Sequence, residues 1–425
     1  MSKLDFPQLF RVRQRFSDSR LQDVESTIRQ QLSTLLLKER IRPGETVALT
    51  AGSRGIHQIA KILRVIVDCL REIGAEPFIV PAMGSHGGGT SDGQLRVLES
   101  LGVTEVTCNC EIRVSMETVV VCQATEGFPV HFDRHAFEAD HVLVCNRIKP
   151  HTRFTGDLQS GLMKMMLIGL GKHHGAEIYH RAIQDFTFGQ IVRSVAREVL
   201  QRCRIVGGLA IIENAFDETA IIEAVMPDHF AIREAALLRQ AESLMPRLPF
   251  DAADLLVVNE IGKNVSGTGM DTNVIGRKFN DHSAIGEERP SIKYIFVRGL
   301  TAETHGNATG IGAAEFTLQR LADQVDPVST ATNCITANHP TGAMIPIAFQ
   351  NDREAIAAAL GSIGLRDPAD TRVMWIENTL RLAELECSAS YLNAAKMHQQ
   401  LELLCEPRPM PFDADGNLPQ SLATA

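Results

Sequence analysis

The stretch ETVALTAGSRGIHQIAKILRVIVDCLREIGAEPFIVPAMG, residues 45–84, decides the fold. Its first part, 45–53, has the apolar run of a buried strand, and apolar residues recur at helical spacing over 56–74. Residues 76–84 again have the composition of a strand. A strand, a helix and a second strand in this order form a βαβ unit with parallel strands. The same alternation continues along the chain, so we predict an α/β fold.

The composition bounds the class of protein. A chain of 425 residues favours two domains over a single core. The formal net charge of -9 and an aromatic content of 5% argue against a nucleic-acid partner. No apolar stretch reaches the roughly 18 residues of a membrane span, and the N-terminus has no apolar signal segment. The nine scattered cysteines are interpreted as reduced thiols. We therefore expect a cytoplasmic protein with no membrane partner.

The domain boundary is predicted from two prolines in PRLPFDAADLLVVNEIG, which place it near Leu248. We expect an N-terminal α/β domain over 1–248 and a C-terminal α/β domain over 249–390, each doubly wound. Strands are predicted at 254–261, 292–300 and 372–378, and helices at 315–325 and 353–363. A C-terminal helix and tail over 391–425 could pack back on the N-terminal domain. The active site is expected in the cleft between the domains.

Three polar residues follow predicted strands in the first half. Arg54 follows the strand at 45–53, His86 follows the strand at 76–84, and His151 ends DHVLVCNRIKPH at 140–151. Ligands of open α/β sheets bind at the carboxyl ends of the strands, so position makes these residues candidates for a site. The alternative is that both histidines are satisfied by loop carbonyls and that Arg54 is a surface arginine at a helix start.

Lys164 lies in the apolar, methionine-rich stretch TGDLQSGLMKMMLIGLGKHHGAEIYHRA, residues 155–182. Such a lysine either extends its ammonium to the surface or stays desolvated, with a lowered pKa and a nucleophilic amine. Taken alone, the surface interpretation is the more frequent one. The histidines that follow at 173, 174 and 180 favour the second, because His173 and His180 lie two turns apart on a predicted helix. No H-E-x-x-H or paired-cysteine pattern accompanies them, and His173 and His174 are interpreted as surface histidines.

These residues together resemble the nickel-dependent lactate racemases and their homologues. The family carries a nickel pincer nucleotide, a pyridinium-3,5-bisthiocarboxylic acid mononucleotide attached covalently to a lysine, with one histidine as protein ligand of the nickel. The lysine of the family matches Lys164 in SGLMKMMLIG, and its nickel ligand matches His180 in IYHR, sixteen residues later. Its two catalytic histidines match His86 in GSHGG and His151 in KPHT, and its substrate arginine matches Arg54.

The resemblance implies a racemase or epimerase of a 2-hydroxy acid. One histidine would remove the hydroxyl proton while Cα delivers hydride to the cofactor, and the other histidine would reprotonate the oxygen after the hydride returns to the opposite face. Arg54 would hold the carboxylate, and Lys164 and His180 would hold cofactor and nickel. The resemblance also implies transient contact with the proteins that make the cofactor, and it leaves a homo-oligomer open.

Departures from the family pattern concern the substrate. Ala51 stands where lactate racemases have an acidic residue, and the turn HGGG lacks the arginine usual after the histidine. Extra glycines leave room and Lys149 could meet a second anionic group, so we expect a substrate other than lactate, such as a larger hydroxy acid or a sugar acid. Lys263, in the glycine-rich stretch 259–277, is a further candidate for substrate binding; the alternative for this stretch is a flexible inter-domain loop.

Two other functions stay open from the sequence. The same fold could use its histidines for a plain divalent metal and act as a lyase or hydrolase. It could also be a nucleotide-binding protein without turnover, in which case His86 and His151 would be dispensable and Lys164 and His180 would not.

Overall fold

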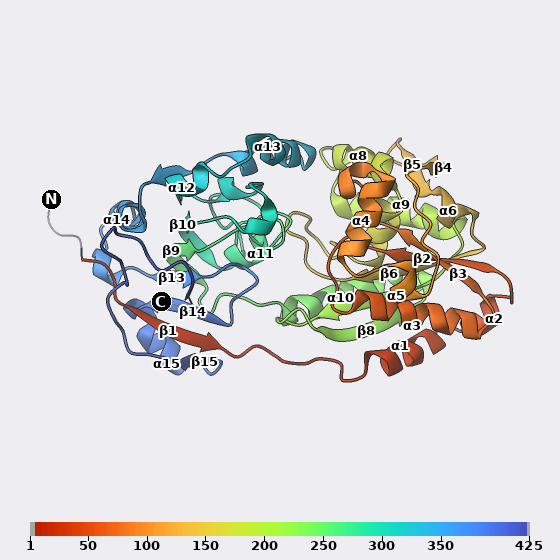
Figure 1. Ribbon diagram of the computed structural model, residues 1–425, viewed down its shortest axis with the longest axis horizontal. Coiled ribbons are helices and arrows are strands. Elements are labelled where there is room, and N and C mark those ends of the chain that lie inside the picture. The colour runs from red at the N-terminus through yellow and green to blue at the C-terminus, as the bar shows by residue number, and fades with distance from the viewer. Residues whose placement is uncertain (1–4, 423–425) are drawn as a thin grey trace. The chain divides into compact units, whose positions relative to one another are not determined.

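The computed structural model describes residues 5–422, and the chain divides into two compact units (Figure 1). The N-terminal unit is Ser17–Met245, and the C-terminal unit consists of residues 5–16 and 246–422. Helices alternate with mainly parallel strands in both units, so the predicted α/β class is confirmed. The chain passes between the units at Met245 and Pro246, where the prolines of the sequence had indicated Leu248.

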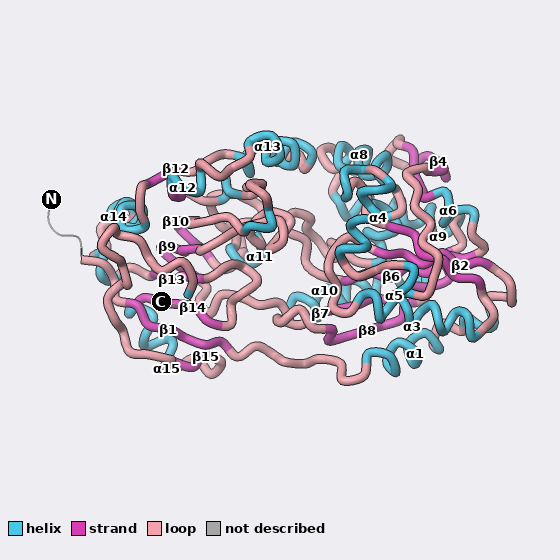
Figure 2. The backbone as a smooth tube through the Cα atoms, viewed as in Figure 1, coloured by secondary structure: helices cyan, strands magenta, loops and turns pink. Residues whose placement is uncertain are grey.

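The sheet of the N-terminal unit has the strand order β3-β2-β6-β7-β8. All neighbouring pairs are parallel except β7 and β8. Because β2 lies between β3 and β6, the strand order reverses there, and the carboxyl ends of strands at such a point are where open α/β sheets generally bind ligands. A separate antiparallel hairpin joins β4 to β5 (Figure 2). The strands of this unit are β2 (Thr46–Ala51), β3 (Glu76–Pro81), β4 (Thr118–Gln123), β5 (Pro129–Asp133), β6 (His141–Arg147), β7 (Ile205–Glu213) and β8 (Thr219–Val225).

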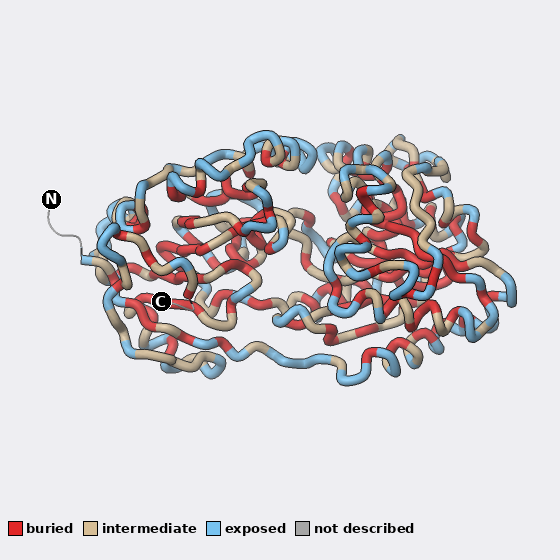
Figure 3. The backbone as a smooth tube through the Cα atoms, in the orientation of Figure 1, coloured by how far each residue is buried: buried red, intermediate tan, exposed pale blue. Residues whose placement is uncertain are grey.

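Helices cover both faces of this sheet because successive strand residues point to opposite sides. Val47 and Leu49 pack with the helices α1 and α3, while Ala48 packs with the segment that carries Lys164 and with α9 and α10. In Figure 3 the strands of this sheet are largely red, the colour of buried residues. The helices are α1 (Val24–Ser33), α2 (Leu37–Arg40), α3 (Ile59–Glu72), α4 (Ser91–Ser100), α5 (Glu105–Cys108), α6 (Arg134–Glu138), α7 (Leu162–Lys164), α8 (Lys172–Ala182), α9 (Phe188–Arg202) and α10 (Phe230–Leu244), with the short turns η1 (Gly87–Gly89), η2 (Met165–Gly169) and η3 (Pro227–His229).

The sheet of the C-terminal unit has the order β12-β11-β10-β9-β13-β14-β1-β15. The strands from β12 to β13 are parallel, and the last three are antiparallel. Its strands are β1 (Leu9–Gln14), β9 (Ala252–Val258), β10 (Ser291–Val297), β11 (Phe316–Leu318), β12 (Ile347–Phe349), β13 (Val373–Ile376), β14 (Glu384–Ser388) and β15 (Leu401–Leu403). Its helices are α11 (Thr272–Ile275), α12 (Gln319–Ala322), α13 (Pro327–Thr336), α14 (Asp352–Ser362) and α15 (Leu392–Met397), with the turns η4 (Ala302–Thr304), η5 (Ile311–Ala313), η6 (Pro340–Ala343), η7 (Pro368–Asp370) and η8 (Ala389–Tyr391).

Both ends of the described chain, 5–16 and 391–422, belong to the C-terminal unit, whereas the expected division was 1–248, 249–390 and 391–425. Strand β1 pairs with β14 and β15, and Phe10 and Val12 enter the core of this unit. In the tail, Leu418 and Leu422 bury against Trp375 in the C-terminal unit. A strand needs partners that are remote in sequence, so local pattern alone does not assign β1 to a domain.

The segment 315–325, predicted as one helix, is instead the strand β11 followed by the short helix α12. Phe316 and Thr317 pair with Phe296 and Val297 of β10. Leu318 is fully buried. The pairing with β10 overrides the helical spacing of the apolar residues, as tertiary context commonly does for short segments.

Candidate active site

The candidate residues of the first half lie at one edge of the N-terminal sheet. Arg54 follows β2, His86 follows β3, and Lys149 and His151 follow β6. These strands are parallel, so their carboxyl ends meet at the same edge, beside the point where the strand order reverses. Lys164 and His180 belong to the same unit.

Arg54 is exposed on the loop after β2, and no carboxylate among residues 5–422 forms an ion pair with it. Surrounding protein nevertheless removes part of the hydration of its guanidinium. This desolvation, and secondly the neighbouring Arg147 cation, lower the pKa of Arg54. Arg147 itself is bound by Glu213. The guanidinium of Arg54 therefore forms no ion pair with the described residues and can bind an anion.

Lys164 is the most perturbed lysine of this edge. Burial, and secondly the charge of Arg54, lower its pKa to about 7. Its ammonium lies 5.0 Å from the centroid of the Phe154 ring, and no carboxylate in the described part of the chain forms an ion pair with it. At neutral pH a substantial fraction of the amine is therefore unprotonated and nucleophilic.

Lys172 shows what a structural lysine looks like in the same stretch. It is fully buried, its ammonium lies 2.8 Å from Asp133, and it donates to the carbonyl of Pro81. This ion pair satisfies the charge, as buried charges require. Only eight positions separate the two lysines, and Lys172 was not among the site residues predicted from the sequence.

The helical segment that carries Lys164 begins at a tight, buried turn. The backbone N–H of Met163 donates to Glu234 at 2.9 Å, and the side-chain amide of Asn146 donates to the carbonyl of Gly161 at 2.8 Å. Gly161 has φ +138°, and a Cβ there would lie 2.7 Å from the carboxyl carbon of Glu234. Burial raises the pKa of Glu234 to about 8. The segment then continues as a π-helical turn, η2, a form often found at functional sites.

His180 lies sixteen residues after Lys164, in α8, and is half-buried. Burial, and secondly the charge of Lys164, lower its pKa, so its imidazole is neutral at neutral pH. A neutral imidazole is the form that binds a metal. His173 instead lies against the glycine turn η1, with Nε2 3.4 Å from Glu177, and His174 is exposed with its ring near His131.

His86 is held by the end of β3 and by the loop after β2. Its Nδ1 lies 2.7 Å from the carbonyl oxygen of Met83 and 3.0 Å from the hydroxyl of Ser53. The turn after it is tight: Gly87 has φ +68°, and a Cβ there would lie 2.4 Å from the backbone of Gly93. This glycine serves the turn, rather than leaving room for substrate as its sequence context suggested. Helix α4 begins directly after the turn, capped by Thr90.

His151 is fixed by its own loop. Its Nδ1 accepts hydrogen bonds from the backbone N–H groups of Arg153 and Phe154, both at 3.0 Å. Its ring stacks on Phe154 at 4.0 Å between centroids, and Phe154 stacks on Phe188 at 3.8 Å. Phe154 therefore joins His151 to Lys164, which lies over the same ring.

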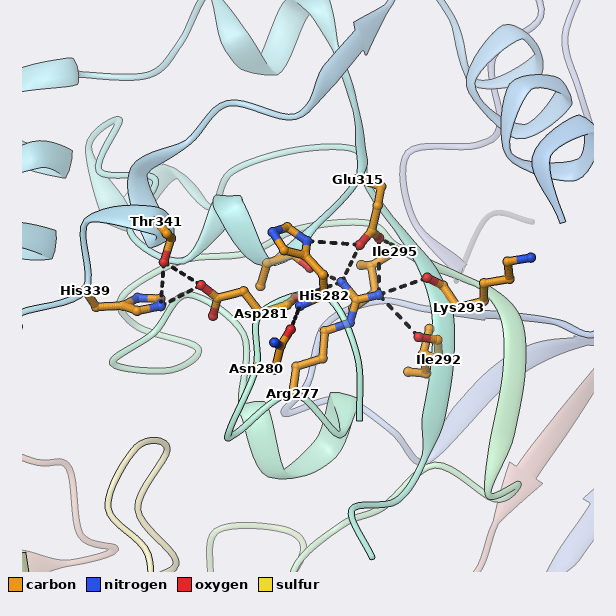
Figure 4. Close-up of polar contacts among 11 residues, drawn as sticks. Arg277, Asn280, Asp281, His282, Ile292, Lys293, Ile295, Glu315, His339 and Thr341 are labelled. Atoms are coloured by element: carbon orange, nitrogen blue, oxygen red, sulfur yellow. Dashed lines mark hydrogen bonds and ion pairs between the residues drawn. The ribbon is translucent and has the colours of Figure 1, made fainter. Parts of the chain in front are cut away.

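Lys263 lies in the other unit, on the loop after β9, and its ammonium donates to the carbonyl of Gly267. The glycine-rich stretch 259–277 is thus part of the C-terminal unit rather than an inter-domain loop. It ends at Arg277, which is fully buried and binds Glu315, as Figure 4 shows. In the same figure His339 and Thr341 both point toward Asp281, at 2.7 and 2.6 Å.

Several contributors to the site carry no signal in the sequence. Glu234 is one acidic residue of an ordinary amphipathic helix, and Ser53 and Phe154 are unremarkable loop residues. Glu234 contacts Met163, which lies 71 positions away in the sequence, and Ser53 contacts His86, which lies 33 positions away. The apolar position of Phe154 between two predicted site residues is the one available hint.

The fold and this edge define a two-unit α/β protein with an unpaired, desolvated lysine beside strand-end histidines. Residues 7–187 match the model of the lactate racemase N-terminal domain, which confirms the resemblance to the lactate racemase family over that span. Arg54, His86, His151, Lys164 and His180 all lie within it.

The fold is similar to that of a solved structure. The lactate racemase apoprotein from Thermoanaerobacterium thermosaccharolyticum superposes with a TM-score of 0.54 and 14% identity, covering 88% of this chain and 99% of that one. A protein from Thermotoga maritima has a TM-score of 0.49 and 12% identity, covering 77% of this chain and 83% of that one. No curated protein matches the chain.

Metal-binding clusters and membrane-spanning helices were looked for among residues 5–422. Within 5–422, no three histidine, cysteine, aspartate or glutamate side chains gather closely enough to hold a metal ion on their own. In the same range, no helix has the length and apolar character needed to span a membrane.

Proposed function

We propose that the N-terminal unit is the catalytic part of a racemase or epimerase of a 2-hydroxy acid, with a nickel pincer nucleotide attached to Lys164. The observation that carries the proposal is Lys164 itself: a desolvated amine with a pKa lowered to about 7 and no acidic partner in the described chain. Such an amine is available for a covalent bond. The match to the lactate racemase N-terminal domain supports a racemase or epimerase at the coarse level.

The residues present fit this group. The pincer brings its own sulfur and carbon donors, so the protein has to supply a single ligand, and His180 is a neutral imidazole whose charge state is coupled to Lys164. When bound, the cofactor supplies a reversible hydride acceptor for Cα of the substrate. The chain contributes the anchor at Lys164 and the metal ligand at His180.

The substrate would lie at the carboxyl edge of the sheet. Arg54 would bind its carboxylate in a bidentate manner, because the guanidinium forms no ion pair with the described residues. His86 and His151 are the groups proposed to act on the hydroxyl, and their loops follow β3 and β6, the strands on either side of β2. Lys149 is half-buried without an acidic partner among residues 5–422 and would meet a second anionic group, which favours a substrate larger than lactate.

Production of the full chain together with the cofactor-making proteins tests the proposal. Intact-protein mass spectrometry is expected to show an added mass on the wild type and on the exposed-lysine control Lys61→Ala. The added mass is expected to be absent from Lys164→Ala and Lys164→Arg, while circular dichroism shows both to be folded. An adduct retained by Lys164→Ala would contradict the anchor.

Screening chiral 2-hydroxy acids with the loaded protein then tests the activity. Inversion at Cα without uptake of solvent deuterium is expected, because the hydrogen returns as hydride. A metal-dependent hydrolysis or elimination without an adduct would favour the lyase or hydrolase, and an adduct without turnover of any acid would favour a nucleotide-binding protein.

A further inference from the structure

The helical segment that carries Lys164 begins at a residue that cannot cap it. The first N–H groups of a helix have no partner within the helix, and the side chain of the N-cap residue usually accepts one of them. The N-cap residue of α7 is Gly161, which has no side chain and has φ +138°, a conformation that L side chains rarely adopt. The segment therefore needs an acceptor from another part of the chain.

Glu234 supplies that acceptor from helix α10. Its Oε2 accepts the backbone N–H of Met163 at 2.9 Å, across 71 positions of sequence. The carboxyl group lies directly against the turn, because a Cβ on Gly161 would lie 2.7 Å from its carboxyl carbon and 2.8 Å from Oε2. The missing Cβ of Gly161 is thus what lets the carboxyl group of Glu234 reach the start of the helix.

A second contact holds the same turn from the sheet. The side-chain amide of Asn146, in β6, donates to the carbonyl of Gly161 at 2.8 Å, and the N–H of Met165 donates to the same carbonyl at 3.0 Å. Lys164 lies between Met163, whose N–H is bound by Glu234, and Met165. Its backbone is therefore fixed on both sides by contacts made at this turn.

The carboxyl group of Glu234 caps the segment without acting as a counter-ion. It is 1% exposed, no described residue forms an ion pair with it, and its Oε1 has no hydrogen-bond partner among residues 5–422. Burial raises the pKa of Glu234 to about 8, and hydrogen bonds from the N–H groups of Met163 and Leu162 offset only part of this effect. At neutral pH the group is therefore mainly an uncharged acid. A carboxylate here would favour the ammonium form of the neighbouring lysine.

The amine of Lys164 depends on its position for its low pKa. Burial, and secondly the charge of Arg54, lower that pKa to about 7. The Phe154 ring lies 5.0 Å away, and the charge of Lys164 in turn contributes to the lowered pKa of His180. Burial is the largest cause, so the free amine persists only while the segment keeps it out of water.

We propose that Glu234 is a positioning residue for Lys164: its carboxyl group caps the segment in place of an N-cap side chain and so holds the amine in its desolvated position. It acts through the backbone of Met163 and touches neither cofactor nor substrate. The purpose of this arrangement, attachment of the cofactor, rests on the proposed function. The desolvated amine itself is a property of the cofactor-free chain.

Competitive labelling of the full-length, cofactor-free protein with acetic anhydride measures this amine. The reagent acylates the unprotonated amine, so the labelling of Lys164 against pH, read by peptide mass spectrometry with the exposed Lys61 as reference, gives its midpoint. Glu234→Gln keeps an oxygen that accepts the N–H of Met163, whereas Glu234→Met fills a similar space without an acceptor. Gln240→Met, an exposed change on the same helix, is the control.

The wild type, Glu234→Gln and Gln240→Met are expected to have a midpoint of about pH 7. Glu234→Met should have one at least about one unit higher, because the uncapped first turn admits water to the amine. A wild-type midpoint in Glu234→Met, shown to be folded by circular dichroism, would overturn the proposal. A midpoint in Glu234→Gln that is shifted as far as in Glu234→Met would also overturn it, because the charge rather than the acceptor would then matter. If Glu234→Met does not fold, Gly161→Ala, whose Cβ would displace the carboxyl group, is judged by the same criterion.

Production together with the cofactor-making proteins separates this inference from the proposed function. Glu234→Gln is expected to carry the added mass as the wild type does, and Glu234→Met at least about tenfold less, since a misplaced nucleophile reacts more slowly. Equal loading of the wild type and Glu234→Met would overturn the role of Glu234. If the wild type itself carries no adduct, the proposed attachment fails, while the role of Glu234 is decided by the labelling midpoints alone.

Discussion

The polar residues that follow the parallel strands differ between the two units in whether the protein itself binds them. In the N-terminal unit, β2 and β3 lead to Arg54 and His86, and Arg54 has no acidic partner in the described chain. In the C-terminal unit, β9, β10 and β13 lead to Asn259, Arg298 and Glu377, which are all bound within the unit. The same position in a related architecture is thus open for a ligand in one unit and closed by the chain in the other.

The closing element is the C-terminal tail. Arg298 is 3% exposed, binds Asp352 through two hydrogen bonds at 2.6 and 3.0 Å, and donates to the carbonyls of Leu418 and Pro419. The N–H of Leu418 donates back to Asp352. An arginine at a strand end is therefore no sign of a ligand site by itself: what matters is whether the protein already supplies its anion.

The largest effect is expected at the open edge. His86→Ala should lower turnover of the loaded protein by about 10²–10⁴-fold, because the group that transfers the hydroxyl proton is lost. His173→Ala, which changes a histidine outside the strand ends, should stay close to wild type. The measurement is kcat for inversion of the accepted 2-hydroxy acid, with adduct mass as a check on loading. Wild-type rates in His86→Ala would remove this residue from the site.

At the closed edge the expected effect is on stability rather than on turnover. Asp352→Ala leaves Arg298 buried without its partner, which should cost about 3–5 kcal/mol of the unfolding free energy of the C-terminal unit. Trp375 is the single tryptophan, is buried, and donates to Asn259 in this cluster, so its fluorescence in urea reports on this unit. The exposed Asp370→Ala is the matched control. An unchanged urea midpoint in Asp352→Ala would show that the tail does not hold this edge.

A moderate effect is expected from the pH dependence of Lys164. Its pKa is 10.5 in an ordinary environment and about 7 in the folded protein. Between pH 7 and pH 10.5 the amine binds more protons in the unfolded chain than in the folded protein, so the free energy of unfolding rises with pH. Below pH 7 the amine is protonated in both states, and the cost of burying its charge is then complete.

The variant Lys164→Met removes that penalty. In the cofactor-free protein it should raise the melting temperature by about 2–4 °C at pH 6, with a clearly smaller gain at pH 9. Calorimetry at the two pH values measures the difference. An equal gain at both would mean that the amine is hydrated and unperturbed.

The smallest effect is expected from Lys149→Gln. An unpaired, half-buried cation near a polar edge contributes modestly to binding of a second anionic group, so KM should rise about three- to tenfold while kcat changes little. The effect should shrink at high salt. A substrate with one carboxylate should show no change, and equal effects on both substrates would argue against contact with a second anion.

The βαβ unit of residues 45–84 could be predicted because its signals are local. Strands β2 and β3 and helix α3 follow directly from uninterrupted apolar runs and helical spacing. Strand β1 and the split of 315–325 could not be predicted in this way, since each depends on a partner strand far along the chain. The placement of the tail likewise depends on Arg298 and Asp352, which lie 120 and 66 positions before Leu418.

By itself, the sequence determined the α/β class and which residues of the first half stand at strand ends, because strand and helix periodicity are properties of neighbouring residues. It also singled out Lys164 through its apolar surroundings. Only the tertiary structure decided that Lys164 lacks an ion partner while Lys172 has Asp133, because ion pairing joins separate segments. The partners of Nδ1 in His86 and His151 were decided there too, since they depend on which backbone groups the folded loop brings to each ring.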